Sequence, residues 1–263
     1  MFGGNNFRKS QFNLAVQGER QAGSSFKPFV LATALKEGVA PSTTFVSKPV
    51  TINAGGRLWE VHNYEDEYLG SITIQQATAY SDNAVFAQLT KLVGPQNIAN
   101  TAKSLGIKSR LKPYFSIGLG AQGVNPLEMA RAFSAFANGG KRIDGRRFGN
   151  EPRVITKVAN EKGRPIDDNT ARPVQTLSEE NAALVTSLLQ NVIKYGTGKA
   201  AALAGGPARG RQDGHDGELR RRLVRRLHAA ARDSRLGRLP ERCAVDELPV
   251  PRQARRRRHA SPR

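Results

Sequence analysis

The sequence predicts a mixed α/β (α+β) fold in which helices dominate. Six segments carry apolar residues at the three- and four-residue spacing of a helix that buries one face. Shorter stretches alternate polar and apolar residues, as strands with one buried face do. The composition changes sharply at Arg209, so the patterned part of the chain ends near residue 208.

Composition and charge bound the possible functions. The 263 residues suffice for one large domain or two small ones, and 38% hydrophobic residues permit a core. The net charge of +19 is uneven: from Arg209 onward there are 17 arginines, no lysine and 7 acidic residues, a charge of +10, which leaves +9 for the first 208 residues. The total charge alone therefore does not predict a nucleic-acid partner.

Cysteine usage and hydropathy exclude further classes. The single Cys243 excludes an internal disulfide and a cysteine metal cluster, and the four histidines are scattered. No apolar run approaches the roughly 20 residues that span a membrane, and no signal peptide opens the chain.

The first predicted helix contains a serine and a lysine three residues apart. Residues 5–21 are polar and interrupted by glycine, which predicts an irregular segment. An apolar run then predicts a buried helix from Ser24 to Lys36 that ends near Gly38. Ser24 and Lys27 share a helix face, so a buried, neutral lysine can take the proton of the serine hydroxyl. The alternative is that Ser24 only caps the helix and Lys27 points to solvent.

A second group of polar residues separates two predicted helices. Residues 41–63 alternate in the manner of short strands and loops, and His62 there is expected to be a loop hydrogen-bonder. Ser71–Tyr80 is predicted to be helical, and a further helix begins at Ala84. The intervening Ser81-Asp82-Asn83 is predicted to be a capping loop from which Ser81 and Asn83 can point at a substrate.

The remaining patterned segments are mostly helical. Residues 95–105 and 126–138 are predicted helices, and Pro152–Val158 is a plausible strand. Residues 178–195 are predicted to form a helix with Ser178 at its N-cap and two glutamates in its first turn.

These motifs carry a family resemblance. The segment Gly23–Phe29, with Ser24-x-x-Lys27, resembles the nucleophile segment of penicillin-binding protein transpeptidases, and Ser81-x-Asn83 follows at a similar separation. Residues 114–120 and 135–140 also resemble that family. The resemblance implies a DD-peptidase/β-lactamase-like α/β (α+β) fold, of which this chain holds mainly the helical part, with most strands of the central sheet missing.

The resemblance also implies roles for four residues. Lys27 would accept the proton of Ser24 while Ser24 attacks a D-alanyl-D-alanine stem peptide of peptidoglycan, Ser81 would relay a proton to the leaving amine, and Asn83 would hold the substrate amide and Lys27. β-Lactams would acylate Ser24, and the family needs neither cofactor nor metal. The family works at the extracytoplasmic face of the bacterial cell membrane. Met1 looks like an internal methionine, so a glycosyltransferase domain and a membrane anchor are expected upstream.

The third family motif, Lys-Thr-Gly, is missing. The run Tyr195–Ala201 is not that motif, which is expected shortly after Ala208, where the chain instead reads Arg209-Gly210-Arg211. Codons permitted for Gln212–Leu227, read one base later, allow Lys-Thr-Gly-Thr and a strand-like continuation. We therefore predict a one-base frameshift near Arg209, with residues 1–208 a partial transpeptidase domain and 209–263 a disordered, out-of-frame tail.

Three alternative functions remain open, and the missing motif has one expected consequence for the chain as written. A serine β-lactamase or a DD-carboxypeptidase shares the first two motifs, although no counterpart of the deacylating glutamate of the β-lactamases is visible. A basic nucleic-acid-binding protein would use the 209–263 tail, which has no aromatic residue for base stacking. No nucleic-acid partner is expected. The chain as written is predicted to fold poorly and not to acylate.

Overall fold

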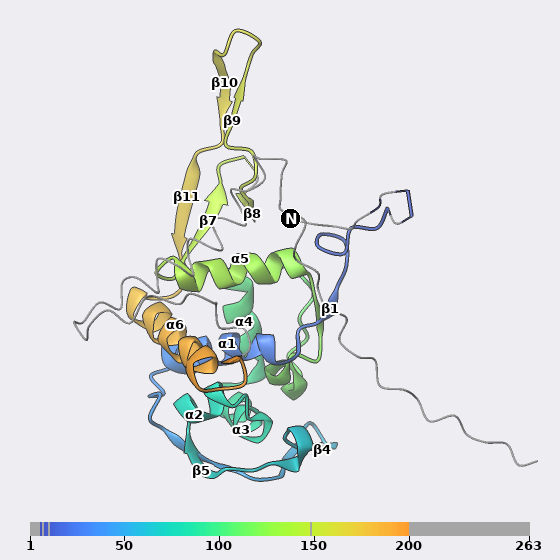
Figure 1. Cartoon of the computed structure of the whole chain (residues 1–263), viewed down its shortest axis with the longest axis vertical. Coiled ribbons are helices and arrows are strands. Elements are labelled where there is room, and N and C mark those ends of the chain that lie inside the picture. The colour runs from blue at the N-terminus through green and yellow to red at the C-terminus, as the bar shows by residue number, and fades with distance from the viewer. Residues whose placement is uncertain (1–5, 7, 10, 148, 200–263) are drawn as a thin grey trace, which may run out of the picture.

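The computed structural model describes residues 6, 8–9, 11–147 and 149–199, which form two regions (Figure 1). The body consists of residues 20–140 and 176–199, with the irregular segment that precedes them, and contains every α-helix that the structure describes. The arm, residues 141–175, is a projection of β-strands beyond helix α5. The predicted tail at 209–263 lies outside the described residues, so the division at residue 208 stays a prediction.

The Ser24–Lys27 segment lies at the centre of the body. Its first turn is a 3₁₀-helix, η1 (Gly23–Phe26), which continues as α1 (Lys27–Lys36) and ends two residues before Gly38. The predicted helix is confirmed, with its first turn wound more tightly. Every residue from Lys27 to Leu35 is buried, because α1 packs against α3, α4 and α6 (bounds below).

Capping residues define the starts of several of the other helices. The side chains of Thr73, Asp82, Asn125 and Ser178 each accept a backbone N–H of the helix that follows. The helices of the body after α1 are α2 (Ile74–Ala79), α3 (Asn83–Val93), α4 (Pro95–Leu105), α5 (Pro126–Ala137) and α6 (Glu179–Lys194), with short 3₁₀ turns η2 (Tyr64–Asp66) and η3 (Phe115–Leu119). The predicted helices over 95–105, 126–138 and 178–195, including the Ser178 cap, are confirmed.

One predicted helix begins too early. Residues 71–73 belong to strand β5 (Gly70–Thr73), which pairs with β2 (Thr44–Ser47), and α2 starts only at Ile74. The reason is the capping box in which Thr73 and Gln76 exchange side-chain-to-backbone hydrogen bonds.

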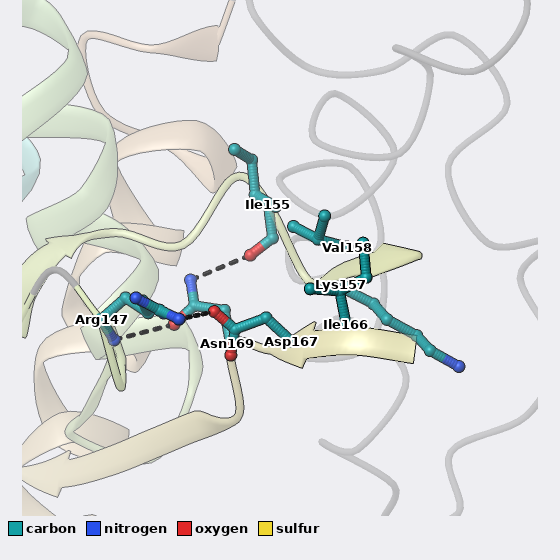
Figure 2. Close-up of a pocket in the computed structure, with 7 residues that line it drawn as sticks. All are labelled: Arg147, Ile155, Lys157, Val158, Ile166, Asp167 and Asn169. Atoms are coloured by element: carbon teal, nitrogen blue, oxygen red, sulfur yellow. Dashed lines mark hydrogen bonds and ion pairs between the residues drawn. The ribbon is translucent and has the colours of Figure 1, made fainter. Parts of the chain in front are cut away.

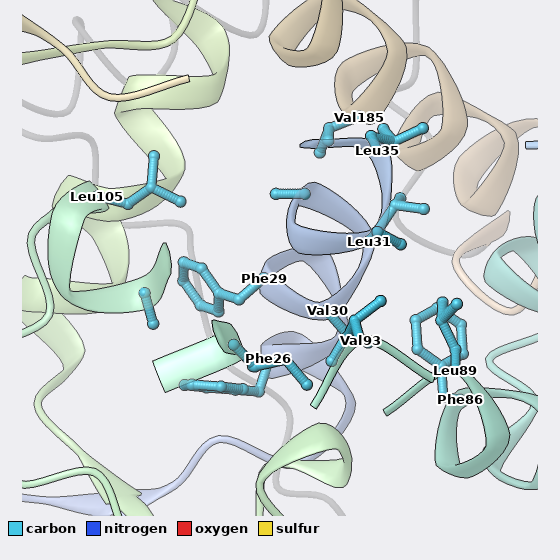
Figure 3. Close-up of a cluster of buried hydrophobic side chains, with 14 of the residues drawn as sticks. Phe26, Phe29, Val30, Leu31, Leu35, Phe86, Leu89, Val93, Leu105 and Val185 are labelled. Atoms are coloured by element: carbon cyan, nitrogen blue, oxygen red, sulfur yellow. The ribbon is translucent and has the colours of Figure 1, made fainter. Parts of the chain in front are cut away.

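The core of the body surrounds α1 (Figure 3). Aromatic and aliphatic residues of η1 and α1 contact α3 through Phe86, Leu89 and Val93, and α6 through Val185. The Phe29 ring lies 4.7 Å from that of Phe26 and about 6 Å from those of two α5 phenylalanines, centroid to centroid. Because α1 is buried on all sides, the residues at its start are held firmly.

The body's strands form small antiparallel pairs. Besides β2–β5, these are β3 (Val50–Asn53) with β4 (Leu58–Val61) and β1 (Arg20–Gln21) with β6 (Gly123–Val124). Short strands within 41–63 are therefore confirmed. In the part of the chain that the structure describes, sheets have two or three strands, as expected for the mainly helical part of the family fold.

The arm consists of a three-stranded sheet and a hairpin. The sheet has the order β11 (Ala171–Gln175), β7 (Lys141–Gly145), β8 (Gly149–Pro152), and the hairpin is β9 (Lys157–Ala159) with β10 (Pro165–Asp168). The predicted strand over Pro152–Val158 is wrong, because residues 153–156 have no regular structure.

A cavity of about 280 Å³ lies at the base of the hairpin. It is lined by three aliphatic residues, Asn169 and the charged Arg147, Lys157 and Asp167 (Figure 2).

Over the described ranges, the helices are all too short or too polar to cross a lipid bilayer.

Candidate active site

The buried Lys27 lies at the centre of a cluster of polar groups, two of whose residues, Ser81 and Asn83, are partly exposed. Its Nζ donates to Ser81 O at 2.6 Å, to Ser81 Oγ at 3.0 Å and to Asn83 Oδ1 at 2.8 Å. Only 5% of Lys27 is exposed. The structure thus brings together three of the four predicted site residues, and the alternative in which Lys27 points to solvent is wrong.

Burial changes the acidity of Lys27. Desolvation lowers its pKa from 10.5 to about 8, and the negative charge of Asp82 partly opposes this. The ring of Phe86, 5.2 Å from Nζ, forms one wall of the site. An ordinary lysine is almost wholly protonated at neutral pH, whereas a lysine with a pKa near 8 supplies a neutral amine that can act as a base.

Ser24 lies one turn before Lys27 and is exposed. Among the described residues its hydroxyl has no hydrogen-bond partner, so the expected contact between Ser24 Oγ and Lys27 Nζ is not a hydrogen bond here. In a 3₁₀ turn, side chains three residues apart are nearly eclipsed, which keeps Ser24 above Lys27. The neighbouring Ser25 differs, because its hydroxyl donates to Ala22 O at 2.6 Å. Ser24 is therefore the hydroxyl open to a ligand.

A second chain segment fixes the start of the Ser24 turn. Gly23 N donates to Gly120 O at 3.0 Å, where residues 114–120 pass beside η1. A Cβ on Gly120 would lie 2.1 Å from Gly23 O, so only glycine permits this approach. This contact gives the 114–120 segment, singled out in the sequence, a role at the site.

The Ser81–Asn83 turn is a cap, as predicted. Asp82 Oδ1 accepts the N–H of Val85 at 2.8 Å, and Asp82 Oδ2 accepts from Ser47 Oγ at 2.5 Å and from Asn63 Nδ2 at 2.7 Å. Sequence reasoning missed Ser47 and Asn63, because a lone serine at the end of a strand or a lone asparagine in a loop carries no signal of the tertiary contact it makes.

His62 is a loop hydrogen-bonder, as expected. Its Nδ1 lies 3.1 Å from Asp66 Oδ1 and 3.2 Å from the Tyr68 hydroxyl, and its carbonyl accepts from Asn83 Nδ2 at 3.1 Å. The backbone of His62 thus orients the Asn83 amide, while its ring faces solvent.

The loop that follows α6 contacts the residues just before the Ser81–Asn83 turn. Thr197 N donates to Ala79 O at 3.1 Å, and the rings of Tyr80 and Tyr195 lie 6.3 Å apart. A Cβ on Gly196 would lie 2.0 Å from Ala79 O. The run from Tyr195 therefore contacts the end of α2 just before Ser81. The place of the missing Lys-Thr-Gly motif lies outside the described residues.

The arrangement suits nucleophilic acyl transfer. An accessible hydroxyl precedes a buried amine of lowered pKa, and a second hydroxyl and a side-chain amide contact that amine. Within the described ranges, histidine, cysteine and carboxylate side chains form no group of three that could hold a metal ion.

The chain is similar in sequence to proteins of a known family. Residues 1–210 match the family model of the penicillin binding protein transpeptidase domain. The chain is 33% identical over 215 residues to penicillin-binding protein 1A of Neisseria gonorrhoeae, an alignment that covers 78% of this chain and 26% of that protein. It spans about a quarter of the length of the curated relatives it matches.

Solved structures show the same similarity. Penicillin-binding protein 1A from Haemophilus influenzae superposes with a TM-score of 0.68 at 26% identity, over 75% of this chain and 34% of that one. The PonA1 protein from Mycobacterium tuberculosis in complex with penicillin V gives a TM-score of 0.63 at 27% identity, over 73% of this chain and 52% of that one.

Proposed function

Because the chain belongs to the transpeptidase domain family of class A penicillin-binding proteins, we propose that it is a peptidoglycan D,D-transpeptidase domain with Ser24 as its nucleophile. The observation that carries the assignment of residues is the buried Lys27, hydrogen-bonded to Ser81 and Asn83 one turn after the exposed Ser24.

The proposed reaction has two acyl transfers. Neutral Lys27 takes the proton of Ser24 as Ser24 Oγ attacks the carbonyl between the two D-alanines of a stem peptide. The backbone N–H of Ser24 stabilises the oxyanion, and the C–N bond breaks as Lys27 returns the proton through Ser81 to the leaving D-alanine. An amine of a second stem peptide then attacks the Ser24 ester, which forms the crosslink and restores the hydroxyl.

Asn83 has two tasks in this mechanism. Its Oδ1 accepts from Lys27, which fixes the amine, and the rest of its amide is available to the acyl-chain amide of the substrate once it turns from His62 O. A β-lactam imitates the D-alanyl-D-alanine bond and leaves a slowly hydrolysed Ser24 ester. The complex of a similar protein with penicillin V supports this inhibitor class.

The proposed setting is the extracytoplasmic face of a bacterial membrane. Relatives named penicillin-binding protein 1A are about four times as long as the matched part of this chain. We propose that a glycosyltransferase domain and a membrane anchor accompany this domain in the whole protein, and that peptidoglycan stem peptides are its partners.

The proposal includes a frameshift near Arg209. The family match ends at residue 210, which supports a loss of the reading frame there. Without Lys-Thr-Gly, the proposed site lacks the lysine of the third motif and one donor of the oxyanion site. The chain as written is therefore proposed not to acylate, and sequencing the coding DNA across codons 205–215 tests the frame directly.

Labelling with a fluorescent penicillin tests the whole proposal. We compare the chain as written with a chain whose frame is restored after codon 208, each with Ser24→Ala and with the matched control Ser25→Ala. The frame-restored chain and its Ser25→Ala variant should become labelled, whereas Ser24→Ala and the chain as written should not. Label that persists in Ser24→Ala, or no label on the folded frame-restored chain, overturns the proposal.

A further inference from the structure

Asn63 uses its whole side chain to hold the start of α3. Its Oδ1 accepts the backbone N–H of Asn83 at 2.8 Å and of Ala84 at 3.0 Å. Its Nδ2 donates to Asp82 Oδ2 at 2.7 Å and to Glu67 O at 2.9 Å, with Ser47 Oγ at 3.3 Å. A residue outside both recognised motifs therefore contacts the second motif at two successive residues.

These bonds complete the cap of α3. The first N–H groups of a helix have no partner within the helix. Asp82 accepts the N–H of Val85, and Asn63 accepts the two before it, at Asn83 and Ala84. The first three N–H groups of α3 are thus all satisfied, two of them by a side chain that is twenty residues away in sequence.

The turn before α3 needs such support. Ser81 has φ of 56°, a left-handed conformation that residues with a side chain rarely adopt and that persists only where its surroundings hold it. On one side it is held by Lys27, which donates to Ser81 O, and by Asp82 N, which donates to Ala77 O at 2.9 Å. On the other side the contacts run through Asn63 to Asp82 and Asn83.

We propose that Asn63 is a positioning residue, which holds the Ser81–Asn83 turn where Ser81 and Asn83 can hydrogen-bond to Lys27. That Lys27 serves as the base for Ser24 rests on the proposed function, whereas the positioning itself does not. Without Asn63, the turn relaxes and its oxygen acceptors move away from Lys27 Nζ.

The chemistry of position 63 is specific. The side chain must accept from two N–H groups on one side and donate to the Asp82 carboxylate on the other, which a neutral amide does. Leucine has a similar size but offers neither interaction. An aspartate at position 63 keeps the acceptor but places a second carboxylate against Asp82, and like charges at that distance repel. The other titratable groups of this loop belong to His62, Tyr64, Glu65, Asp66, Glu67 and Tyr68.

A reciprocal exchange tests the proposal on the full chain. In Asn63→Asp the bond to Asp82 becomes a repulsion, and in the double variant Asn63→Asp/Asp82→Asn the donor and the acceptor change places, so the bond can form again. Two readouts that need no penicillin are measured: hydrogen exchange at the amides of Asn83 and Ala84, and the NMR titration of the Lys27 side chain.

The matched control lies in the arm. Asn160 Oδ1 also accepts two backbone N–H groups, of Lys162 at 3.1 Å and of Arg164 at 2.9 Å. Asn160→Leu therefore removes a side-chain oxygen that accepts two backbone N–H groups far from Lys27. Asn63→Leu removes such an oxygen at the site.

The outcomes are separable. Asn63→Leu and Asn63→Asp should speed exchange at Asn83 and Ala84 by about tenfold or more and shift the Lys27 titration, whereas Asn160→Leu should change neither. The double variant should return the exchange rates at Asn83 and Ala84 to within about threefold of the wild type. Its Lys27 titration is not part of this comparison, because Asp82→Asn also removes the negative charge that raises the pKa of Lys27. Wild-type values in Asn63→Asp, or exchange in the double variant no closer to wild type than in Asn63→Asp, overturn the proposal. If Asn63→Leu unfolds, the Asp pair still decides. Failure of penicillin labelling leaves these readouts unaffected.

Discussion

The body and the arm differ in how far their side chains are buried. In the body, Lys27 and Asp82 are almost fully buried, and each makes several hydrogen bonds. In the arm, β9 and β11 are exposed along their whole length, and Val158 and Ile166 are 45% and 67% exposed. Burial forces polar groups to find fixed partners, so precise chemistry is possible in the body. In the arm, Asp144 and Asn169 are buried in the same way, whereas the β9–β10 hairpin is held mainly by its backbone ladder.

The largest expected contrast concerns two ion pairs. Asp144 of β7 binds Arg131 of α5 and Arg142, and the Arg131 and Asp144 side chains are only 7% and 8% exposed. The Asp144–Arg131 pair joins the arm to the body, whereas the pair of Arg147 and Asp167 lies wholly within the arm, with side chains 60% and 29% exposed. Asp144→Ala leaves buried cations uncompensated and should cost about 3–5 kcal/mol, whereas Asp167→Ala should cost less than about 1 kcal/mol.

Urea unfolding followed by circular dichroism measures both variants. Equal losses would mean that the junction between arm and body is no more buried in solution than the surface pair, and the comparison would fail there.

An isoleucine in each region gives the next contrast. Ile98 of α4 is fully buried in the core, whereas Ile166 of β10 is mostly exposed. Ile98→Ala removes buried methylene groups and leaves a cavity, which should lower the free energy of unfolding by about 2–5 kcal/mol. Ile166→Ala should change it by less than about 0.5 kcal/mol. A comparable loss at Ile166 in urea titration would indicate that another surface covers the arm.

The same difference explains which elements the sequence predicts. The helices over 95–105 and 126–138 are visible because each buries one face and so repeats its apolar residues at helical spacing. Strand β11 was missed because all five of its residues are exposed, which leaves no alternation to detect. The start of α2 at Ile74 does have a signal in the sequence, because Thr73 and Gln76 have the spacing of a capping box.

The candidate site likewise contains residues that the sequence predicts and residues that it does not. The resemblance of the two motifs to the transpeptidase family predicts that Ser24, Lys27, Ser81 and Asn83 act together, and in the structure Lys27, Ser81 and Asn83 meet. Ser47 and Asn63 could not be found in this way. Their contacts exist only because the end of β2, with Ser47, and the loop before β5, with Asn63, lie against the start of α3, and one sequence gives no local sign of that approach.

A third prediction concerns the effect on stability of burying the positive charge of Lys27. The folded pKa of Lys27, about 8, lies below its ordinary value of 10.5. Below pH 8 both the folded and the unfolded chain are protonated there, so burial of the charge opposes folding. Between pH 8 and 10.5 the unfolded chain binds more protons, so stability should rise with pH, by about 3 kcal/mol in all.

The difference in unfolding free energy between the wild type and Lys27→Met isolates this group from the others that titrate. Lys157→Met on the exposed β9 controls for the loss of one positive charge. A wild-type minus Lys27→Met difference that stays constant from pH 8 to 10.5 would show that Lys27 is not buried as a charge in the body.

The smallest expected effect lies in the arm alone. Gly163, in the turn between β9 and β10, has φ of 75°, and a Cβ there would meet no other atom within 4 Å. Gly163→Ala therefore introduces only backbone strain, of about 1 kcal/mol. Since the hairpin shares little buried surface with the body, this strain should speed hydrogen exchange of the β9 and β10 amides about fivefold and leave those of α1 and α3 unchanged. Exchange that quickens equally in α1 would mean that the arm and the body unfold as one unit, because strain confined to the hairpin turn would then have reached the helix that carries Lys27.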